Sequence, residues 1–327
     1  MVRQRISLVI PVLNEEQNLP ALKTRLAPVL NALDVEWDVL FVDDGSLDGT
    51  VAAIRTFHSE DNRFRGISFS RNFGKECAIA AGLRYATGDA VVLMDADLQH
   101  PPETIAAFLA RWREGNEVVY GQRTDRAHDG PVRRLLANLF YGVFKAMSRT
   151  PLPRGAGDFR LLDRRAVDVL NKLGERARYN NGLYSWIGFR SAGVPYDVAA
   201  REGGAPKWRW RRLFGFALDG LMSFSTVPLR MSSVLGLCIS LAALAYAIVF
   251  FVKTLILGID VPGFPTLVIS IMVLSGVQLI SLGVLGEYLG RIYEEVKGRP
   301  LFIVAEEIGI DAAHRPANAE RIAEQAR

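Results

Sequence analysis

Apolar runs rich in β-branched residues alternate with amphipathic stretches over the N-terminal part of the chain. The runs predict strands, and apolar positions three and four residues apart predict helices between them. This alternation is typical of a mostly parallel sheet with right-handed crossovers, so we expect an α/β fold. The predicted strands are Ile6–Pro11, Trp37–Val42, Gly66–Ser70, Ala90–Met94 and Val118–Tyr120, and the predicted helices are Leu19–Leu33, Gly49–Phe57, Lys75–Ala86 and Pro102–Arg113.

Acidic residues follow three of these strands. They are Glu15 and Glu16, Asp43 and Asp44, and Asp95 and Asp97. The carboxyl ends of parallel strands meet at one edge of the sheet, where crowded carboxylates repel each other unless a cation or hydrogen-bond donors share the site. The spacing of Asp95 and Asp97 lets both lean on one Mg²⁺ or Mn²⁺, which prefer oxygen ligands, and such a metal would hold a diphosphate. The alternative is a helix N-cap before Pro101 and Pro102, with both acids merely solvated.

Two apolar segments differ from everything before them. Half of the residues are hydrophobic (50%), and the excess lies in the uncharged runs Met231–Val252 and Phe264–Leu285. At ~1.5 Å per residue each run extends about 33 Å, enough to cross the hydrocarbon core of a bilayer. Basic residues flank the pair rather than the linker 253–263, which predicts a multi-pass protein of the cytoplasmic membrane with that linker outside. Because Met1–Arg5 leads into a strand without a signal peptide, we expect the N-terminal domain and both termini to be cytoplasmic.

Basic and aromatic residues surround the predicted spans. The segments 131–149 and 207–230 can form helices with an apolar aromatic face and a basic edge, which suits an interfacial position on a bilayer; the alternative for each is an ordinary core-facing helix. Beyond the spans, Pro300–Val304 predicts a lone strand, which needs a partner edge in the main domain or in a neighbouring subunit. We therefore divide the chain into a catalytic domain (1–206), interfacial helices (207–230), two spans (231–287) and a C-terminal strand with a loose tail (288–327).

Composition and missing motifs exclude several classes of protein. The formal net charge of +4 is concentrated at Arg123–Arg134 and Lys207–Arg212, which favours phosphates or anionic lipid heads. No recognised nucleic-acid motif accompanies it, so we expect no nucleic-acid partner. The chain lacks Gly-x-Gly-x-x-Gly after its first strand and lacks a P-loop, which disfavours a dinucleotide dehydrogenase and a P-loop NTPase. Its two cysteines, Cys77 and Cys238, do not form a disulfide framework.

An ordered set of motifs, covering roughly residues 5 to 305, resembles a known family. Ile10–Glu15, Val42–Ser46, Arg71–Lys75 and Asp95–Gln99 are similar to the motifs of the family 2 inverting glycosyltransferases, which have a GT-A fold. Three further motifs resemble the polyisoprenyl-phosphate glycosyltransferases, a group with bactoprenol glucosyltransferases and dolichol-phosphate mannose synthase: Gly155–Leu161, Ser185–Phe189 and Gly286–Tyr293.

The resemblance implies a role for individual residues. It implies a nucleotide-sugar site at Pro11, Glu15, Asp43, Asp44, Lys75 and Asp95, and a Mg²⁺ or Mn²⁺ site at Asp95, Asp97 and Gln99. It also implies that the lipid phosphate is gripped by Arg123, Arg133 (or Arg134 in its place), Arg201 and Lys207. The surroundings of Lys207 depart from the family pattern, because Pro206 and Trp208 stand where Ser and Tyr are usual.

Asp158 resembles the acid usually proposed as the catalytic base, and with Asp97 and Arg123 it completes the predicted catalytic set. A phosphate monoester acceptor has a second pKa near ~6, so it is mostly ionised at neutral pH and needs little help from a base. Asp158 then has two alternatives to proton transfer. It positions the acceptor arginines or the cation, or it is a structural carboxylate paired to Arg160 or Arg164.

The resulting hypothesis is an inverting transferase that moves a sugar, glucose first, from a UDP-sugar to undecaprenyl phosphate at the cytoplasmic membrane face. Within the enzyme class, a GDP-mannose-dependent mannosyltransferase and a UDP-aminosugar transferase stay open. A processive polysaccharide synthase is disfavoured, since the chain lacks Gln-x-x-Arg-Trp near its spans. From another class, a non-catalytic membrane scaffold stays open too. The resemblance also implies a homo-oligomer, namely a tetramer.

Overall fold

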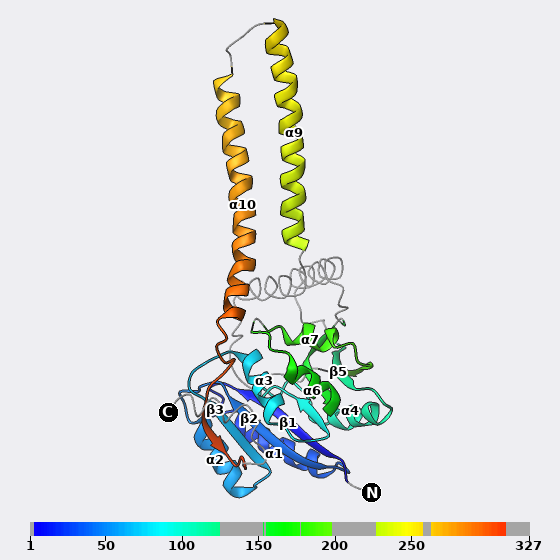
Figure 1. Cartoon of the computed structure of the whole chain (residues 1–327). Helices are drawn as coiled ribbons and strands as arrows, with labels where there is room; N and C mark the ends of the chain where they lie inside the picture. The colour runs from blue at the N-terminus through cyan, green and yellow to red at the C-terminus, as the bar shows by residue number, and fades with distance from the viewer. Residues whose placement is uncertain are drawn as a thin grey trace.

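The computed structural model describes residues 3–124, 153, 155–176, 178–197, 227–257 and 263–311. An α/β domain, here called the head, carries two long helices that rise together from one side of it (Figure 1). We call these two helices, α9 (Val227–Leu257) and α10 (Phe264–Val296), the stem.

The head is built on a mixed, mostly parallel sheet in the order β7-β5-β6-β4-β1-β2-β3-β8. The pairs β4–β1, β1–β2, β2–β3 and β5–β7 are parallel, while β6 runs antiparallel to β4 and β5 and β8 runs antiparallel to β3. The strands are β1 (Arg5–Val12), β2 (Glu36–Asp43), β3 (Phe64–Phe69), β4 (Ala90–Leu93), β5 (Val118–Arg123), β6 (Ala156–Asp163), β7 (Ser191–Tyr196) and β8 (Val304–Ile308).

Helices cover both faces of this sheet. Alternate residues of the central strands point to opposite faces, so Leu8 packs in one apolar core and Val9 in the other. The first core contains α1 (Leu19–Asn31), α2 (Thr50–Glu60) and α4 (Thr104–Arg113), and the second contains α3 (Lys75–Tyr85), α6 (Arg164–Lys172) and α7 (Asn180–Trp186). Burial on both faces explains why the central strands are continuous apolar runs.

These elements confirm the predicted α/β alternation and the mostly parallel sheet. The predicted elements agree with the structure to within a few residues at each end, but β6, β7, α6 and α7 were not predicted. The C-terminal strand pairs with β3 of the head, as one of the two predicted alternatives required, yet it lies at Val304–Ile308 instead of Pro300–Val304. Its glutamates explain the shift: Glu306 binds Arg55 and Glu307 accepts from Tyr85, contacts that a hydrophobic pattern does not reveal.

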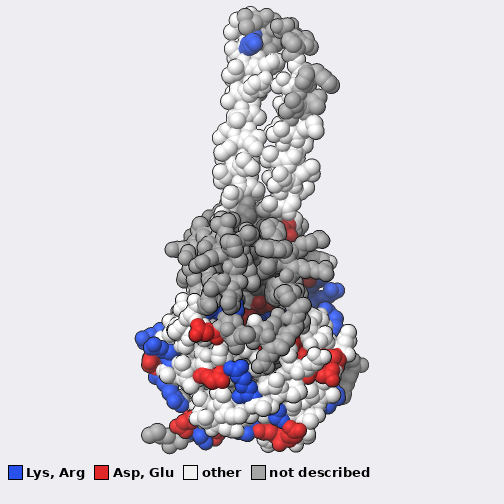
Figure 2. All heavy atoms as spheres, turned by 180° about the vertical axis from the view of Figure 1, so that it is seen from behind, with Lys and Arg blue, Asp and Glu red and all other residues white. Residues whose placement is uncertain are grey.

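Both stem helices contain a window that is long and apolar enough to cross a membrane, Met231–Phe250 in α9 and Ser270–Val296 in α10. Neither window is buried against the head, which is the opposite of a soluble core helix. The space-filling view shows charged residues gathered on the head and a stem surface that is almost entirely uncharged (Figure 2). The stem therefore supports membrane association of this chain.

The stem helices are longer than predicted. The predicted boundary at residue 287 falls inside α10, which continues to Val296. Isolated glycines cost a helix only about 1 kcal/mol each, and Gly286 and Gly290 are tolerated here. An ion pair between Arg291 and Glu287 one turn apart, at 3.1 Å, supports the helical continuation. The predicted interfacial segment 131–149 and residues 207–226 of the predicted segment 207–230 lie outside the described residues. The last four residues of the second segment, 227–230, belong to α9 instead, because the stem helix begins at Val227.

Candidate active site

The loops that follow β1, β2 and β3 are bound to one another at the carboxyl edge of the sheet. Asn14, in a left-handed conformation (φ 53°), donates its backbone N–H to Ser46 Oγ at 2.8 Å and accepts from Leu47 N–H at 2.9 Å. Gly45 (φ 75°) packs against the loop after β3 so closely that a Cβ would lie 2.5 Å from the carbonyl carbon of Arg71. Glycine is therefore required there, and the predicted rim is a rigid platform.

The two aspartates after β2 build this platform. Buried Asp43 accepts from Ser46 N–H at 3.1 Å and from Ser68 Oγ at 2.6 Å. Asp44 accepts from the backbone N–H groups of Phe73 (2.7 Å) and Gly74 (3.0 Å), directly before α3. Burial raises the pKa of Asp44, although these two amides oppose the shift. Asp44 thus fixes the loop that presents Lys75, while Asp43 joins the loop after β2 to β3. The contact of both carboxylates with a nucleotide stays a prediction.

Pro11 and Glu15, also predicted at this rim, lie at the end of β1 and just after it. Pro11 is the neighbour of Val42 in the sheet register and is half-buried. The Glu15 carboxylate accepts from Asn18 Nδ2 at 2.5 Å, and its backbone N–H donates to Thr50 Oγ1 at 2.9 Å. Both residues therefore lie at the predicted sheet edge.

Lys75 is the residue that brings the predicted site together. Its Nζ lies 2.6 Å from Asp95 Oδ1 and 2.8 Å from Asp158 Oδ2, so one ammonium group joins the end of β4 to the start of β6. Burial alone would raise the pKa of Asp158, but the charge of Lys75 and its hydrogen bond outweigh burial and hold that pKa below its ordinary value. Burial opposes the two carboxylates at Lys75 as well, yet Asp158 and Asp95 together raise the pKa of Lys75.

Asp158 keeps one oxygen for another partner. Its Oδ1 is buried and has no hydrogen-bond partner among the described residues, an arrangement that costs free energy unless a ligand or water fills it. The predicted structural alternative for Asp158, a pair with Arg160 or Arg164, is not what the structure shows. Arg160 donates to Asn181 Oδ1 at 2.7 Å, and Arg164 donates to the Gly88 carbonyl oxygen at 2.9 Å.

The segment after β4 turns sharply and holds its acids in place. Asp97 Oδ1 accepts from Gln99 N–H at 3.2 Å across Leu98, which adopts a left-handed conformation (φ 58°). The Asp95 N–H donates to Nδ1 of His100 at 3.2 Å, and the His100 ring stacks on Phe159 of β6 with centroids 4.7 Å apart. These contacts fix the backbone at Asp95 and the side chain of Asp97.

A divalent cation fits the chemistry of this segment. Asp95 and Asp97 supply carboxylate oxygens and Gln99 an amide, which are hard donors that suit Mg²⁺ or Mn²⁺. The Asp95 carboxylate already binds a positive group, the Lys75 ammonium, at 2.6 Å. Over the described part of the chain, no group of three or more His, Cys, Asp or Glu side chains is arranged as a metal site. The predicted site therefore depends on two carboxylates and an amide, and it stays a prediction.

Arg123 ends β5 beside this cluster. Its side chain is exposed, and its backbone N–H donates to the Gly155 carbonyl oxygen at 3.4 Å. Burial raises the pKa of Tyr196; the charge of Arg123 lowers it, while Asp95 and Asp97 raise it, so Tyr196 is near enough to feel the charges of both sides. Arg123 is thus at the edge of the predicted acceptor side. The other predicted phosphate-binding residues, Arg133 or Arg134, Arg201 and Lys207, lie outside the described residues.

A layer of buried polar residues lies behind Lys75 and Asp158, and of these the sequence had suggested only Arg160, as a partner of Asp158. Arg160 is buried, and its guanidinium lies 3.8 Å from the ring centroid of Tyr184. Burial raises the pKa of Glu76, in the first turn of α3, to about 7. His100 belongs to this missed set too: burial lowers its pKa, against the charges of Asp95 and Asp97. Arg160 lies within a quoted motif, and Glu76 and His100 directly follow one. That position was the only sign of their importance in the sequence.

Comparisons with known proteins place the chain among glycosyltransferases. The sequence profile described as Glycosyl transferase family 2 matches residues 7–170. An uncharacterized glycosyltransferase of Synechocystis sp. is 45% identical over 94% of this chain and 96% of its own length. The SfII prophage-derived bactoprenol glucosyl transferase of Shigella flexneri is 40% identical over 92% of this chain and 97% of its own length.

Among solved structures, a glucosyl-3-phosphoglycerate synthase from Mycobacterium tuberculosis, in complex with Mn²⁺, UDP-glucose and phosphoglyceric acid, matches with a TM-score of 0.45 and 21% identity. The match covers 67% of this chain and 78% of that one. The profile match and the relatives that align along nearly their full length confirm the resemblance found in the sequence motifs: the chain belongs to glycosyl transferase family 2.

Proposed function

We propose that this glycosyltransferase moves glucose from UDP-glucose to a polyprenyl phosphate, undecaprenyl phosphate in the first instance, at the cytoplasmic face of the membrane. The observation that carries the proposal is the full-length similarity to a bactoprenol glucosyl transferase, with 40% identity. The Lys75–Asp95–Asp158 cluster supports it, because it lies at the sheet edge where α/β enzymes bind their ligands. The apolar stem supports a lipid acceptor.

The proposed reaction is one displacement with inversion. An oxygen of the lipid phosphate forms a bond to the anomeric carbon of glucose, and the bond from that carbon to the diphosphate breaks. The electron pair leaves with the nucleoside diphosphate. A divalent cation held by Asp95, Asp97 and Gln99 would supply charge neutralisation for the diphosphate.

Asp158 acts in this scheme through its charge. A carboxylate whose pKa is held low by Lys75 is a weak base, and a phosphate acceptor is mostly ionised at neutral pH. Lys75 keeps Asp158 ionised and directs its Oδ2, which leaves the buried Oδ1 to accept a hydrogen bond from the substrate side. Arg123 is the proposed first partner of the lipid phosphate, together with Arg133, Arg201 and Lys207. Proximity and electrostatic stabilisation thus provide most of the rate acceleration.

The membrane arrangement is proposed with the enzyme. Arg291, Lys297 and Arg299 follow the apolar part of α10, which favours a cytoplasmic head with both termini on the same side. A homotetramer remains part of the proposal, and the mass of the detergent-solubilised protein tests it.

A donor and acceptor panel tests the proposed function. The purified chain in lipid nanodiscs is incubated with undecaprenyl phosphate and labelled UDP-glucose, UDP-galactose, UDP-N-acetylglucosamine or GDP-mannose, with and without Mn²⁺. We expect lipid-linked label from UDP-glucose only. Label from GDP-mannose or from the aminosugar would replace the donor by one of the two alternatives. Nucleotide binding without any lipid-linked product would favour the scaffold and overturn the proposal.

A further inference from the structure

Within the described part of the chain, Arg176 attaches the lower end of the stem to the head. Its backbone N–H donates to Glu295 Oε1 at 2.6 Å, and its Nη1 donates to the Glu295 carbonyl oxygen at 3.1 Å and lies 3.3 Å from Glu295 Oε2. Its Nε donates to the Arg299 carbonyl oxygen at 2.9 Å. Arg176 therefore holds the last turn of α10 and the residues just after it in one fixed orientation.

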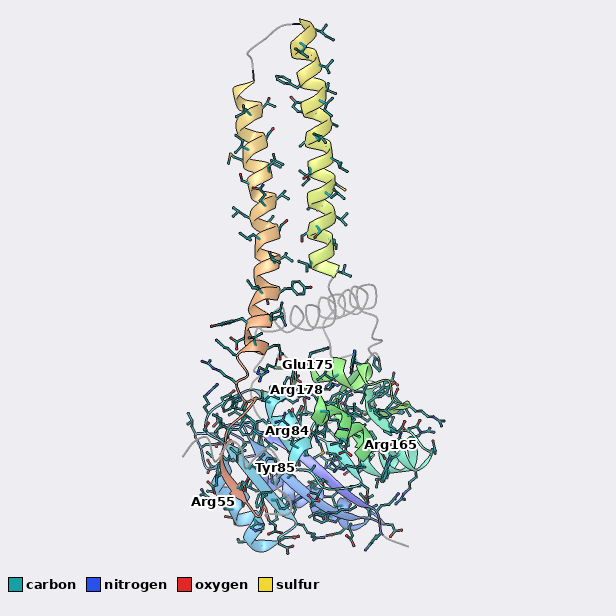
Figure 3. The ribbon with its side chains drawn as sticks, in the orientation of Figure 1. Arg55, Arg84, Tyr85, Arg165, Glu175 and Arg178 are labelled. Atoms are coloured by element: carbon teal, nitrogen blue, oxygen red, sulfur yellow. The ribbon has the colours of Figure 1, made fainter. Side chains whose placement is uncertain are left out.

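The same part of the head leads directly into α7. Arg178 joins the segment to the helix, because its Nη1 donates to the Leu173 carbonyl oxygen at 3.2 Å and its Nε donates to Asn180 Oδ1 at 3.3 Å. Figure 3 shows Glu175 and Arg178 at the upper side of the head, beside α7 and below the stem. The attachment point of α10 and the start of α7 are thus neighbours in space as well as in sequence.

The first residue of α7 contacts the helix that carries Lys75. The Asn180 N–H donates to Glu76 Oε2 at 2.9 Å, and Asn180 Nδ2 donates to the Glu76 carbonyl oxygen at 3.2 Å. Glu76 is the next residue after Lys75 in the first turn of α3. Two hydrogen bonds from one buried asparagine therefore fix the turn from which the Lys75 side chain extends.

The rest of α7 contacts the strand that carries Asp158. Asn181 Oδ1 accepts from Arg160 Nη2 at 2.7 Å, and the Tyr184 ring stacks on the same guanidinium at 3.8 Å. Arg160 is two residues after Asp158 on β6, so both side chains leave the same face of that strand. One short helix thus holds both members of the Lys75–Asp158 pair.

We propose that Arg176, Asn180 and Asn181 form a strut that sets the height of the Lys75–Asp158 pair above the membrane, with Arg176 as a positioning residue for transfer to a membrane-embedded acceptor. The proposal rests on the proposed function, because only a lipid acceptor has its phosphate held at a fixed depth. A mismatch of about 1 Å between reacting groups costs up to about 100-fold in rate. A rigid link from α10 to the pair prevents that mismatch.

A stabilising role explains Arg176 less well. The Arg176 side chain is 26% exposed and its partner Glu295 is 40% exposed. Both side chains are partly reached by water, which screens the pair and reduces its contribution to folding. The four hydrogen bonds that Arg176 donates to the last turn of α10 and the residues after it instead define the orientation of that helix end. Removal of the side chain is therefore expected to leave the fold intact and to alter geometry.

The experiment compares two acceptors in the full-length chain. One is undecaprenyl phosphate in nanodiscs, and the other is citronellyl phosphate, a short soluble polyprenyl phosphate that can reach the site at any height. The variants are Arg176→Ala and the exchange Arg176→Glu with Glu295→Arg. The control is Arg55→Ala, which removes another arginine–glutamate pair between the head and the C-terminal segment, with Glu306 at 2.6 Å, far from α7.

We expect Arg176→Ala to reduce transfer to the embedded acceptor about tenfold and transfer to the soluble acceptor less than about twofold. The exchange variant is expected to recover part of the loss, and Arg55→Ala to match the wild type with both acceptors. An equal loss with both acceptors, or no loss with either, overturns the strut. A wild-type enzyme that transfers glucose to neither acceptor overturns the proposed function, a result distinct from failure of the strut alone.

Discussion

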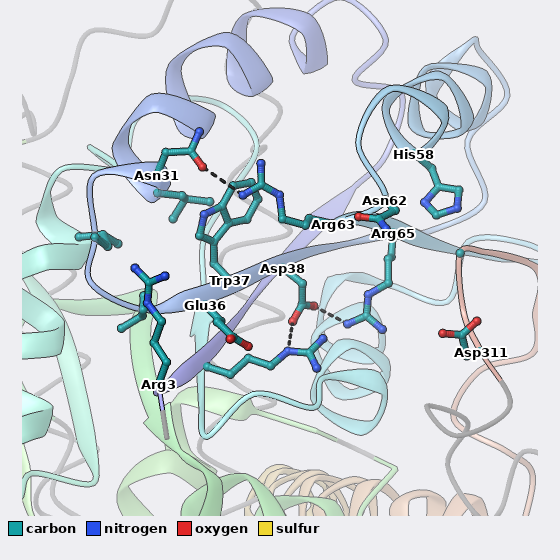
Figure 4. A pocket seen from close by; sticks show the side chains of 15 residues that line it. Arg3, Asn31, Glu36, Trp37, Asp38, His58, Asn62, Arg63, Arg65 and Asp311 are labelled. Atoms are coloured by element: carbon teal, nitrogen blue, oxygen red, sulfur yellow. Dashed lines mark hydrogen bonds and ion pairs between the residues drawn. The ribbon is translucent and has the colours of Figure 1, made fainter. Parts of the chain in front are cut away.

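Two clusters of charged side chains lie at opposite edges of the same sheet, and their composition is reversed. At the amino edge, Asp38 of β2 is buried between two arginines: Arg5 Nε lies 3.2 Å from its carboxylate, and Arg65 donates to its other oxygen. Ser7 Oγ donates to it at 2.9 Å. These residues line or adjoin a cavity of about 680 Å³ (Figure 4).

At the carboxyl edge acids outnumber bases instead, because two carboxylates, Asp95 and Asp158, share the single ammonium of Lys75. The amino-edge cluster therefore has a surplus positive charge and the carboxyl-edge cluster a surplus negative one. Only the second attracts a divalent cation, which would in turn hold the anionic diphosphate. The roomy cavity at the amino edge is thus no rival for the active site, since an enzyme site is defined by unbalanced charge of the right sign more than by volume.

The largest expected effect is a loss of transfer activity, caused by a substitution at the carboxyl edge. Asp97→Ala removes a predicted metal oxygen, together with the acceptor of the Gln99 N–H. We expect this variant to show no detectable transfer, and EDTA to have the same effect on the wild type, with Mn²⁺ restoring the latter alone. Labelled lipid product measures both. Full wild-type activity in metal-free buffer would remove the cation from the site.

Asp158→Asn is the next test, because it keeps the shape of the side chain and cancels its charge. Of its two ion pairs with Asp95 and Asp158, Lys75 would then keep the one with Asp95. We expect transfer to fall about 10²–10³-fold, the range seen when one electrostatic contact to a transition state is lost. Binding of UDP, measured by calorimetry, should change little. A variant that transfers at the wild-type rate would reduce Asp158 to a structural carboxylate.

The acids that directly follow the strands could be predicted from the sequence, but the side chains that pair with them could not. Acids that directly follow apolar runs are a local pattern, so the positions of Asp43, Asp44, Asp95 and Asp97 could be predicted from the sequence. Their shared edge follows from the parallel topology alone. The uncharged runs of the stem were predictable for the same reason, since length and composition are local properties.

The pairing of Lys75 with Asp158 is different, because it requires β6 to lie beside β4. No periodicity in the sequence indicates that antiparallel insertion, and the motif resemblance placed Lys75 and Asp158 in separate roles. The strut was hidden likewise, because Asn180 and Arg176 act through backbone atoms of distant segments. Contacts of this kind appear only when the tertiary structure is known.

A substitution at the amino edge should lower stability and leave transfer activity unchanged, whereas the substitutions at the carboxyl edge are expected to lower activity. Asp38→Ala leaves Arg65 buried without its acid, and breaking such a pair costs about 3–5 kcal/mol. We expect the free energy of unfolding, measured by denaturant titration in detergent, to fall by that amount. Transfer activity per folded molecule should be unchanged. The control Arg3→Ala removes an exposed pair with Asp34 and should leave both quantities near the wild type. Loss of activity in folded Asp38→Ala would end the contrast between the two edges.

The smallest effect concerns Glu76, which lies between the strut and the Lys75–Asp158 pair. Burial, followed by the negative charge of Asp158, raises the pKa of Glu76 from its ordinary value near 4.5 to about 7, while the Asn180 N–H and the charges of Lys75 and Arg178 oppose the shift. Between those two pH values the folded chain binds a proton that the unfolded chain has lost. The Glu76 contribution to stability is therefore full below about pH 4.5 and decreases as the pH rises to about 7.

Glu76→Gln tests this sign, because glutamine imitates the protonated acid at every pH. We expect the variant to be more stable than the wild type by about 1–3 kcal/mol at pH 8 and equal to it near pH 4.5, as measured by denaturant titration at a series of pH values. Glu114→Gln, at an exposed helix end, is the matched control and should give a parallel profile to the wild type. If Glu76→Gln lost stability at pH 8 instead, the carboxylate of Glu76 would be needed in its charged form. The ionised Glu76 would then be balanced by Arg178 and Lys75, and the buried layer behind the carboxyl edge would hold one more negative charge than the protonated acid gives it.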